Sequence, residues 1–122
     1  MVMRGIVALM AFLLAAASAS AFVVVERWQP SEDALFSEFV DNTVTLDTDD
    51  LGPDDRLKVV FMIPELGVRA SRGPYDPRGS HDTVQRTLWL PDGTEPGEYV
   101  VRMTVTDNHG NKRIRHRFVE IE

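Results

Sequence analysis

Acidic side chains gathered in one short stretch are the first residues of this sequence that could do chemistry. Asp47, Asp49 and Asp50 lie in the run DTDDLGPDD, and carboxylate oxygens are ligands that Ca²⁺ prefers. Alignment with an EF-hand loop fails, because Leu51 falls where an oxygen ligand belongs and Lys58 replaces the bidentate glutamate. We interpret the stretch as a solvated acidic turn, with a looser calcium site between strands as the alternative.

Other catalytic and metal-binding patterns are missing from the sequence. His81, His109 and His116 lack the spacing that would bring two of them to one metal on a strand. The chain has no cysteine, which excludes disulfides, thiol catalysis and zinc-thiolate sites. Ser80 is followed by His81 and Asp82, but no G-x-S-x-G elbow is present. We therefore expect a non-enzymatic protein without a cofactor.

Three aromatic residues could instead bind a carbohydrate by stacking. They are Trp28, Tyr75 and Trp89. In a strand over residues 83–90, Trp89 has the opposite parity to Leu88 and Leu90, so it points away from their apolar face. Packing of these rings inside the protein is the alternative interpretation, and we favour it.

The single basic run, KRIRHR at residues 112–117, is a second candidate for binding. On a strand it would place Arg113, Arg115 and Arg117 on one face. Such a stripe could bind an anionic partner: an acidic glycan, a lipid headgroup surface, or the acidic half of a neighbouring copy. The interpretation that we favour is a charged strand that prevents edge-to-edge aggregation.

Strands must position these residues, because the hydrophobic pattern has a period of two from residue 40 onward. Strands are predicted at residues 43–46, 56–63, 83–90, 99–106 and 112–121, with a short edge strand at 66–70. The Gly- and Pro-rich residues 71–81 are predicted to form a loop, and residues 107–111 a hairpin turn. The pattern slips near Phe118, which predicts a β-bulge there. Residues 40–122 are therefore expected to form an all-β, antiparallel β-sandwich of six to seven strands.

The N-terminal part is predicted to differ from the sandwich. Residues 22–39 are interpreted as a lead-in segment, whose start could be a first strand and which contains a short helical turn after Pro30. Residues 1–21 have a basic start, an apolar run and the small-x-small triplet Ala-Ser-Ala, as in a cleaved signal peptide. An uncleaved membrane anchor is the alternative, because residues 5–25 carry no charge. Either reading predicts a secreted or extracytoplasmic protein.

The charge of the chain indicates which classes of partner it can bind. The net charge is −6, with ten acidic residues and one arginine in residues 22–55 against nine acidic and eleven basic residues in 56–122. This balance argues against nucleic acid, because affinity for phosphate needs concentrated positive charge. A membrane would be contacted only through an uncleaved N-terminal segment.

One stretch resembles a known kind of domain. Residues 96–107, PGEYVVRMTVTD, followed by a polar turn and a closing strand, resemble the last two strands of immunoglobulin-like (Ig-like) domains, including PKD-like domains of prokaryotic surface proteins. The resemblance implies an Ig-like sandwich in which Tyr99 makes a corner contact to upstream backbone. It also implies a structural or adhesive element of the cell envelope, with a protein, envelope or self-association partner. A module binding carbohydrate or an anionic ligand is the alternative.

Overall fold

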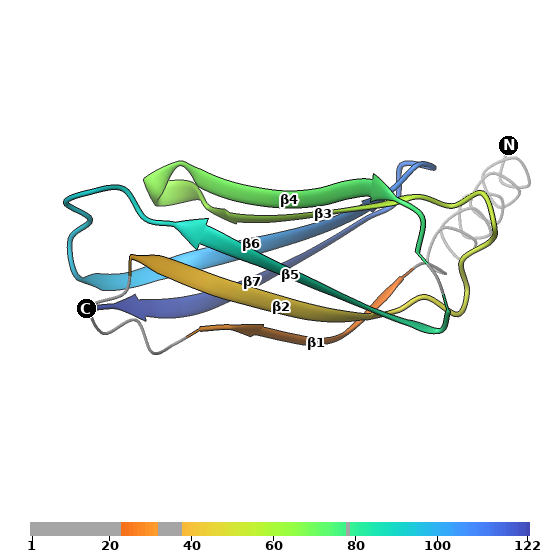
Figure 1. The fold of residues 1–122 in the computed structure, drawn as a ribbon, viewed down its shortest axis with the longest axis horizontal. Coiled ribbons are helices and arrows are strands. Elements are labelled where there is room, and N and C mark those ends of the chain that lie inside the picture. Colours follow the sequence, from red (N-terminus) through yellow and green to blue (C-terminus); the bar gives the residue numbers. More distant parts are fainter. Residues whose placement is uncertain (1–22, 32–37, 78) are drawn as a thin grey trace, which may run out of the picture.

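Two antiparallel sheets face each other in a computed structural model of the chain, which describes residues 23–31, 38–77 and 79–122 (Figure 1). This arrangement confirms the predicted β-sandwich. One sheet has the strand order β1-β2-β5, and the other has the order β4-β3-β6-β7. The elements are β1 (Val24–Pro30), β2 (Phe39–Asp47), β3 (Leu57–Ile63), the 3₁₀ turn η1 (Pro64–Leu66), β4 (Val68–Tyr75), β5 (His81–Trp89), β6 (Gly97–Asp107) and β7 (Lys112–Ile121).

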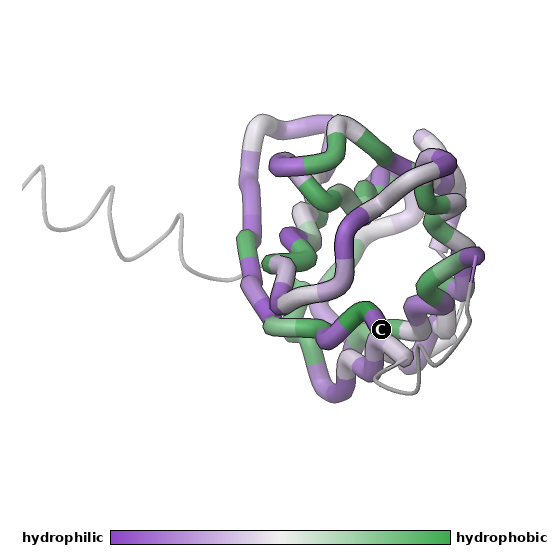
Figure 2. The backbone as a smooth tube through the Cα atoms, turned by 90° about the vertical axis from the view of Figure 1, so that its left-hand side faces the viewer, coloured by the Kyte–Doolittle hydropathy of each residue, from purple (hydrophilic) through white to green (hydrophobic). Residues whose placement is uncertain are grey.

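Alternating side chains build the core between the sheets. Figure 2 looks along the sandwich and shows hydrophobic and hydrophilic segments interspersed around it. Buried and less buried positions alternate along β2, β3 and β6, so each of these strands turns one face inward. The faces predicted for the strands at residues 56–63 and 99–106 are buried as expected. With no disulfide available, this packing has to stabilise the fold. The buried core consists of Val23, Val40, Val44, Leu46, Leu57, Val59, Phe61, Ile63, Val84, Leu88, Tyr99, Val101, Met103, Val105, Val119 and Ile121.

The predicted corner contact of Tyr99 is present. Its ring is buried at the start of β6, and its hydroxyl donates a hydrogen bond of 2.6 Å to the backbone carbonyl of Glu95. The contact connects the loop between β5 and β6 to the first residues of β6. The hairpin turn between β6 and β7 is also where it was predicted, with Gly110 at φ 88°.

The sandwich begins before Val40. β1 pairs antiparallel with β2 from Val24↔Asp47 to Pro30↔Asn42, so part of the proposed lead-in segment is a strand of the first sheet. The helical turn expected after Pro30 falls mainly on residues 32–37, and the signal peptide or anchor falls on residues 1–21; both lie outside the described residues. Within the described residues, no helix is long and apolar enough to cross a bilayer.

The prediction of a loop at residues 71–81 is wrong for residues 71–75, which belong to β4. β4 continues to Tyr75, and Val59 pairs with Arg72 while Leu57 pairs with Tyr75. Pro74 is tolerated there because β4 is an edge strand, where one side of the backbone needs no ladder hydrogen bonds. A register shift between Leu57 and Val59 marks the irregularity that the Gly-Pro pair introduces.

The predicted β-bulge near Phe118 is also wrong. β6 and β7 pair without a register shift from Gly97↔Ile121 to Thr106↔Lys112. Phe118 and Ile114 instead lie on the outer face of their sheet, 61% and 43% exposed. The inward positions of β7 before Val119 are occupied by arginines, which is possible because β7 is an edge strand with solvent beside it.

Candidate functional site

An exposed aromatic pair lies at one end of the first sheet. Phe39 at the start of β2 and Trp89 at the end of β5 are cross-strand neighbours. Their odd-numbered positions point outward, because Val40 and Leu88 beside them point into the core. The ring centroids are 5.2 Å apart with an interplanar angle of 57°, which is a tilted aromatic contact. The side chain of Trp89 nevertheless stays 64% exposed.

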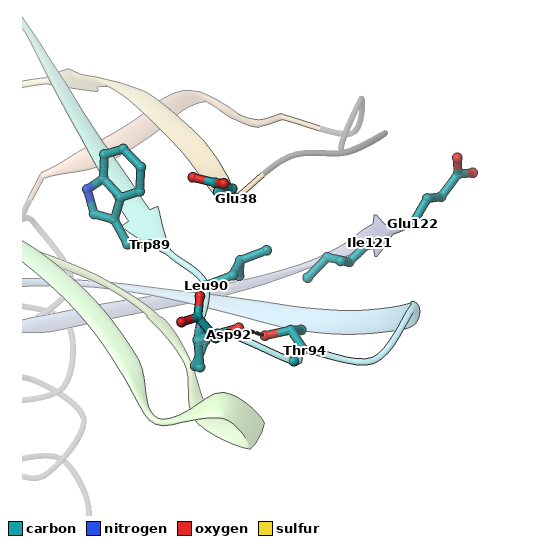
Figure 3. Close-up of a pocket in the computed structure, with 9 residues that line it drawn as sticks. Glu38, Trp89, Leu90, Asp92, Thr94, Ile121 and Glu122 are labelled. Atoms are coloured by element: carbon teal, nitrogen blue, oxygen red, sulfur yellow. Dashed lines mark hydrogen bonds between the residues drawn. The ribbon is translucent and has the colours of Figure 1, made fainter.

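A hollow of about 370 Å³ opens beside the indole, and we call it the Trp89 hollow (Figure 3). Figure 3 shows that its walls come from separate parts of the chain: the start of β2, the end of β5 with the turn after it, and the end of β7. Its volume is within the range of small-molecule sites. The lining residues are Glu38, Trp89, Leu90, Pro91, Asp92, Gly93, Thr94, Ile121 and Glu122.

Backbone hydrogen bonds fix the shape of the Trp89 hollow. The amide of Leu90 donates to the carbonyl of Glu38 at 2.8 Å, which continues the β2–β5 pairing past Trp89. The amide and the hydroxyl of Thr94 both donate to the carbonyl of Pro91, at 3.2 and 2.6 Å. Gly93 has φ 81°, a left-handed conformation that lets the chain turn tightly there. The hollow is thus largely preformed by a short, hydrogen-bonded turn.

Carboxylates dominate the polar side chains of the Trp89 hollow. Glu38, Asp92 and Glu122 are exposed, and none of them forms an ion pair with another described residue. A ligand here would meet hydrogen-bond acceptors and negative charge together with the indole of Trp89. This combination repels anions and suits hydroxyl or ammonium donors.

Tyr75, the second aromatic candidate, lies at the opposite end of the sandwich from Trp89. It is the last residue of β4 and lies near the start of β5, whereas Trp89 is the last residue of β5. The eight residue steps along β5 separate the two ends by roughly 25 Å. The guanidinium of Arg72 covers its ring at 4.0 Å. Burial raises the pKa of Tyr75 above its ordinary value, and the carboxylate of Asp82, which lies close to the hydroxyl, raises it further. The hydroxyl is buried and does not reach Asp82 with the geometry of a hydrogen bond. The structure therefore does not bring Tyr75 and Trp89 into one site.

Trp28 has a packing role, as the alternative interpretation predicted. Its ring lies 6.4 Å from that of Phe61 and is packed against the core, so little of the indole face is open to a sugar. Its Nε1 is buried without a hydrogen-bond partner. Of the three aromatic candidates, only Trp89 presents an open face, so the packing interpretation that we favoured is wrong for this residue: its position in β5 turns it away from the core, and it is 64% exposed.

The arginine stripe lies on β7 and has the inward parity of that edge strand. Arg113, Arg115 and Arg117 pair with the core residues of β6. The guanidinium of Arg117 donates a hydrogen bond of 2.7 Å to the backbone carbonyl of Trp28 in β1, so it connects the edges of the two sheets. Arg115 is exposed and donates to the carbonyl of Ile114 at 3.2 Å. The stripe is a feature of the sandwich edge and does not line the Trp89 hollow.

The acidic stretch between β2 and β3 holds itself together by hydrogen bonds. Asp47 accepts from the amide of Asp49 at 3.0 Å, and Asp55 accepts from the amide of Gly52 at 2.7 Å. Asp49 and Asp50 are exposed. No group of three or more acidic or histidine side chains is placed to hold a metal ion among residues 23–31, 38–77 and 79–122.

The histidines also lie apart. His81 contacts Glu26 of β1 at 3.1 Å, and His109 in the β6–β7 turn contacts Asp55 at 2.6 Å. Asp107 organises the same turn, because its carboxylate accepts hydrogen bonds from the amides of His109 and Asn111 and from the Asn111 side chain. Burial alone would raise the pKa of Asp107, but these hydrogen bonds outweigh it and lower the pKa.

Phe39 is the site residue that the sequence analysis missed. It was assigned to the lead-in segment, and nothing local marks it as a neighbour of Trp89. Once β2 is extended back by one residue, however, its parity opposes that of the buried Val40 and predicts an outward side chain. No protein-family model matches the sequence, and no curated protein matches it either.

Proposed function

We propose that the chain is an exported, non-enzymatic Ig-like module that acts as a structural or adhesive element of a cell envelope. Export rests on the leader-like pattern of residues 1–21. The non-enzymatic role rests on the lack of a nucleophile elbow or a cysteine in the sequence.

The topology and one hydrogen bond support the Ig-like reading. The chain crosses between the sheets after β2, after β4 and after β5, so β1, β2 and β5 can be assigned to Ig strands A, B and E. The strands β4, β3, β6 and β7 then take the places of C′, C, F and G. The hydrogen bond from Tyr99 to the carbonyl of Glu95 corresponds to the tyrosine corner at the start of strand F.

The exposed pair of Trp89 and Phe39 carries the adhesive part of the proposal. Large aromatic residues are usually buried, whereas Trp and Tyr are enriched at interfaces because they bury much area at a low cost in conformational entropy. Trp89 is exposed while Val84 and Leu88 of the same strand are buried, and the ring of Phe39 contacts the indole. An attachment surface at this end of a rigid sandwich explains both features.

The test measures attachment to isolated envelopes of the native host. Envelope fractions are incubated with the purified full-length protein and with the variants Trp89→Ala and Phe118→Ala, and the bound fraction is measured by sedimentation. Phe118 is the matched control, because it is 61% exposed on the other sheet and outside the Trp89 hollow. We expect Trp89→Ala to detach the protein and Phe118→Ala to leave it attached.

Two outcomes would contradict this function. One is recovery of the native protein in the cytoplasmic fraction. The other is attachment that is the same for the wild-type protein and for both variants, which would remove the role of the Trp89 end.

A further inference from the structure

We infer that the Trp89 hollow is a binding site for a glycan built of neutral or amino sugars. The inference rests on the proposed function and names the ligand of that attachment surface. Two parts of the site lead to this class of ligand: the open face of the indole, and the carboxylates around the hollow.

The open indole face suits the apolar side of a sugar ring. A pyranose presents C–H groups on its faces and hydroxyls at its rim, so a face can cover an aromatic ring while the rim hydroxyls find acceptors. Trp89 is 64% exposed, and Phe39 is its ring neighbour at a tilt of 57°, so much of the indole stays open to a ligand. Because the two rings are not coplanar, they form a corner and not a flat platform. This geometry fits a soluble chain or a chain end better than the flat surface of a crystalline polymer.

The carboxylates decide which sugars fit. Glu38 lies on the same side of the hollow as the indole, and Asp92 lies in the turn, whereas the side chain of Glu122 after β7 points away from both (Figure 3). Ionised carboxylates accept short hydrogen bonds from hydroxyl and ammonium groups. The same charges repel the carboxylates of uronic acids and the sulfates of sulfated glycans. The site therefore favours neutral and amino sugars and disfavours the acidic glycan that the arginine stripe had suggested.

A cationic segment of a protein is the competing occupant, since a lysine or arginine could also meet the indole and the carboxylates. The hollow favours a glycan because its side walls are formed by a preorganised turn and carry several separate acceptors, as a ring with several hydroxyls requires. The cationic protein is treated below as an outcome of the experiment.

Isothermal titration calorimetry on the purified full-length protein tests the ligand directly. The probes are cellotetraose, mannotetraose, the tetramer of glucosamine and the tetramer of galacturonic acid. We expect binding of at least one of the first three and a weaker or absent signal for galacturonate. Trp89→Ala should reduce the affinity about tenfold or more, and Phe118→Ala should leave it unchanged.

A second variant tests the inference even if Trp89→Ala does not fold. Asp92 is exposed in the turn, so Asp92→Asn keeps the shape of the side chain and removes its charge. We expect it to weaken binding of the glucosamine tetramer several-fold more than binding of a neutral tetramer. The inference is overturned if none of the neutral or amino tetramers binds at millimolar concentration, if Trp89→Ala binds as well as the wild type, or if galacturonate binds most tightly.

Treated envelopes separate a failure of this inference from a failure of the proposed function. Periodate cleaves the vicinal diols of glycans, whereas protease removes surface proteins. Trp89-dependent attachment that is lost after periodate and kept after protease supports the glycan. Trp89-dependent attachment that is lost after protease and that none of the neutral or amino tetramers inhibits overturns the glycan and leaves the attachment module in place. Attachment that does not depend on Trp89 overturns both.

Discussion

Replacing Tyr99 by phenylalanine removes the corner hydrogen bond and little else. The ring is only 9% exposed and stays in the core, while the hydroxyl loses its bond of 2.6 Å to the carbonyl of Glu95. A neutral hydrogen bond contributes on the order of 0.5–1.5 kcal/mol net to the free energy of unfolding. The loss is larger when the remaining partner is buried and unsatisfied. The bond is only partly buried and Glu95 is an exposed residue, so we expect no large additional loss from the remaining carbonyl. We therefore expect the free energy of unfolding to fall by about 1 kcal/mol, and Tm by roughly 4 °C.

Urea denaturation followed by tryptophan fluorescence measures this change. Trp28 packs 6.4 Å from the core residue Phe61, so its emission reports on loss of the core. Tyr75→Phe is the matched control, because the buried Tyr75 hydroxyl forms no hydrogen bond of ordinary geometry, and its removal also takes away a group that lies close to the carboxylate of Asp82. Its removal should be neutral within about 0.5 kcal/mol or slightly stabilising. If both variants lose the same free energy, or if Tyr99→Phe loses none, the corner hydrogen bond does not stabilise this sandwich.

Three further perturbations test other parts of the fold. Gly73→Ala should lower the free energy of unfolding by about 2 kcal/mol or more, because Gly73 has φ 106° and an added Cβ would overlap the carbonyl oxygen of Leu57. Gly67→Ala also has a positive φ but open space around the new methyl group, so a larger loss there in chemical denaturation would contradict the reasoning. Arg117→Ala should cost about 1 kcal/mol through the lost bond to the Trp28 carbonyl, and Arg115→Ala less than about 0.5 kcal/mol; equal losses would argue against a bridge between the sheet edges. Asp107 has a lowered pKa in the folded protein, so its carboxylate stabilises the fold above about pH 4, and this contribution disappears as the pH falls through the folded pKa. The difference in unfolding free energy between the wild type and Asp107→Asn should therefore shrink on acidification, and a difference that is constant with pH would refute the role of this carboxylate.

Much of the strand layout follows from hydrophobic periodicity alone. β3 and β6 have two clean alternating faces, and the inward faces predicted for them are the buried ones. The turn at residues 107–111 carries its own Gly and Asn, so local chemistry predicts its position. The outward direction of Trp89 follows from the same alternation, because the buried Leu88 comes directly before it.

The same use of hydrophobic periodicity gave wrong predictions for the edge strands β4 and β7. In β4, Gly73 and Pro74 indicated a loop, although an edge strand tolerates both residues. In β7, the apolar side chains of Ile114 and Phe118 suggested a bulge, although they point to solvent in an unbroken register. At an edge one side of the strand is solvated, so the hydrophobic pattern no longer has to separate inside from outside, and its predictive value falls.

The sequence by itself determined the all-β class, the alternating core faces of the central strands and the outward direction of Trp89, because each depends on residues one or two positions apart. Only the tertiary structure decided that Phe39 lies beside Trp89, that the carboxylates of Glu38, Asp92 and Glu122 share one hollow, and that Tyr75 lies at the far end. These relations join residues separated by tens of positions, and they depend on strand register and on the order of strands in the sheets. No local pattern encodes that order, because it arises only when the two sheets bury their apolar faces against each other.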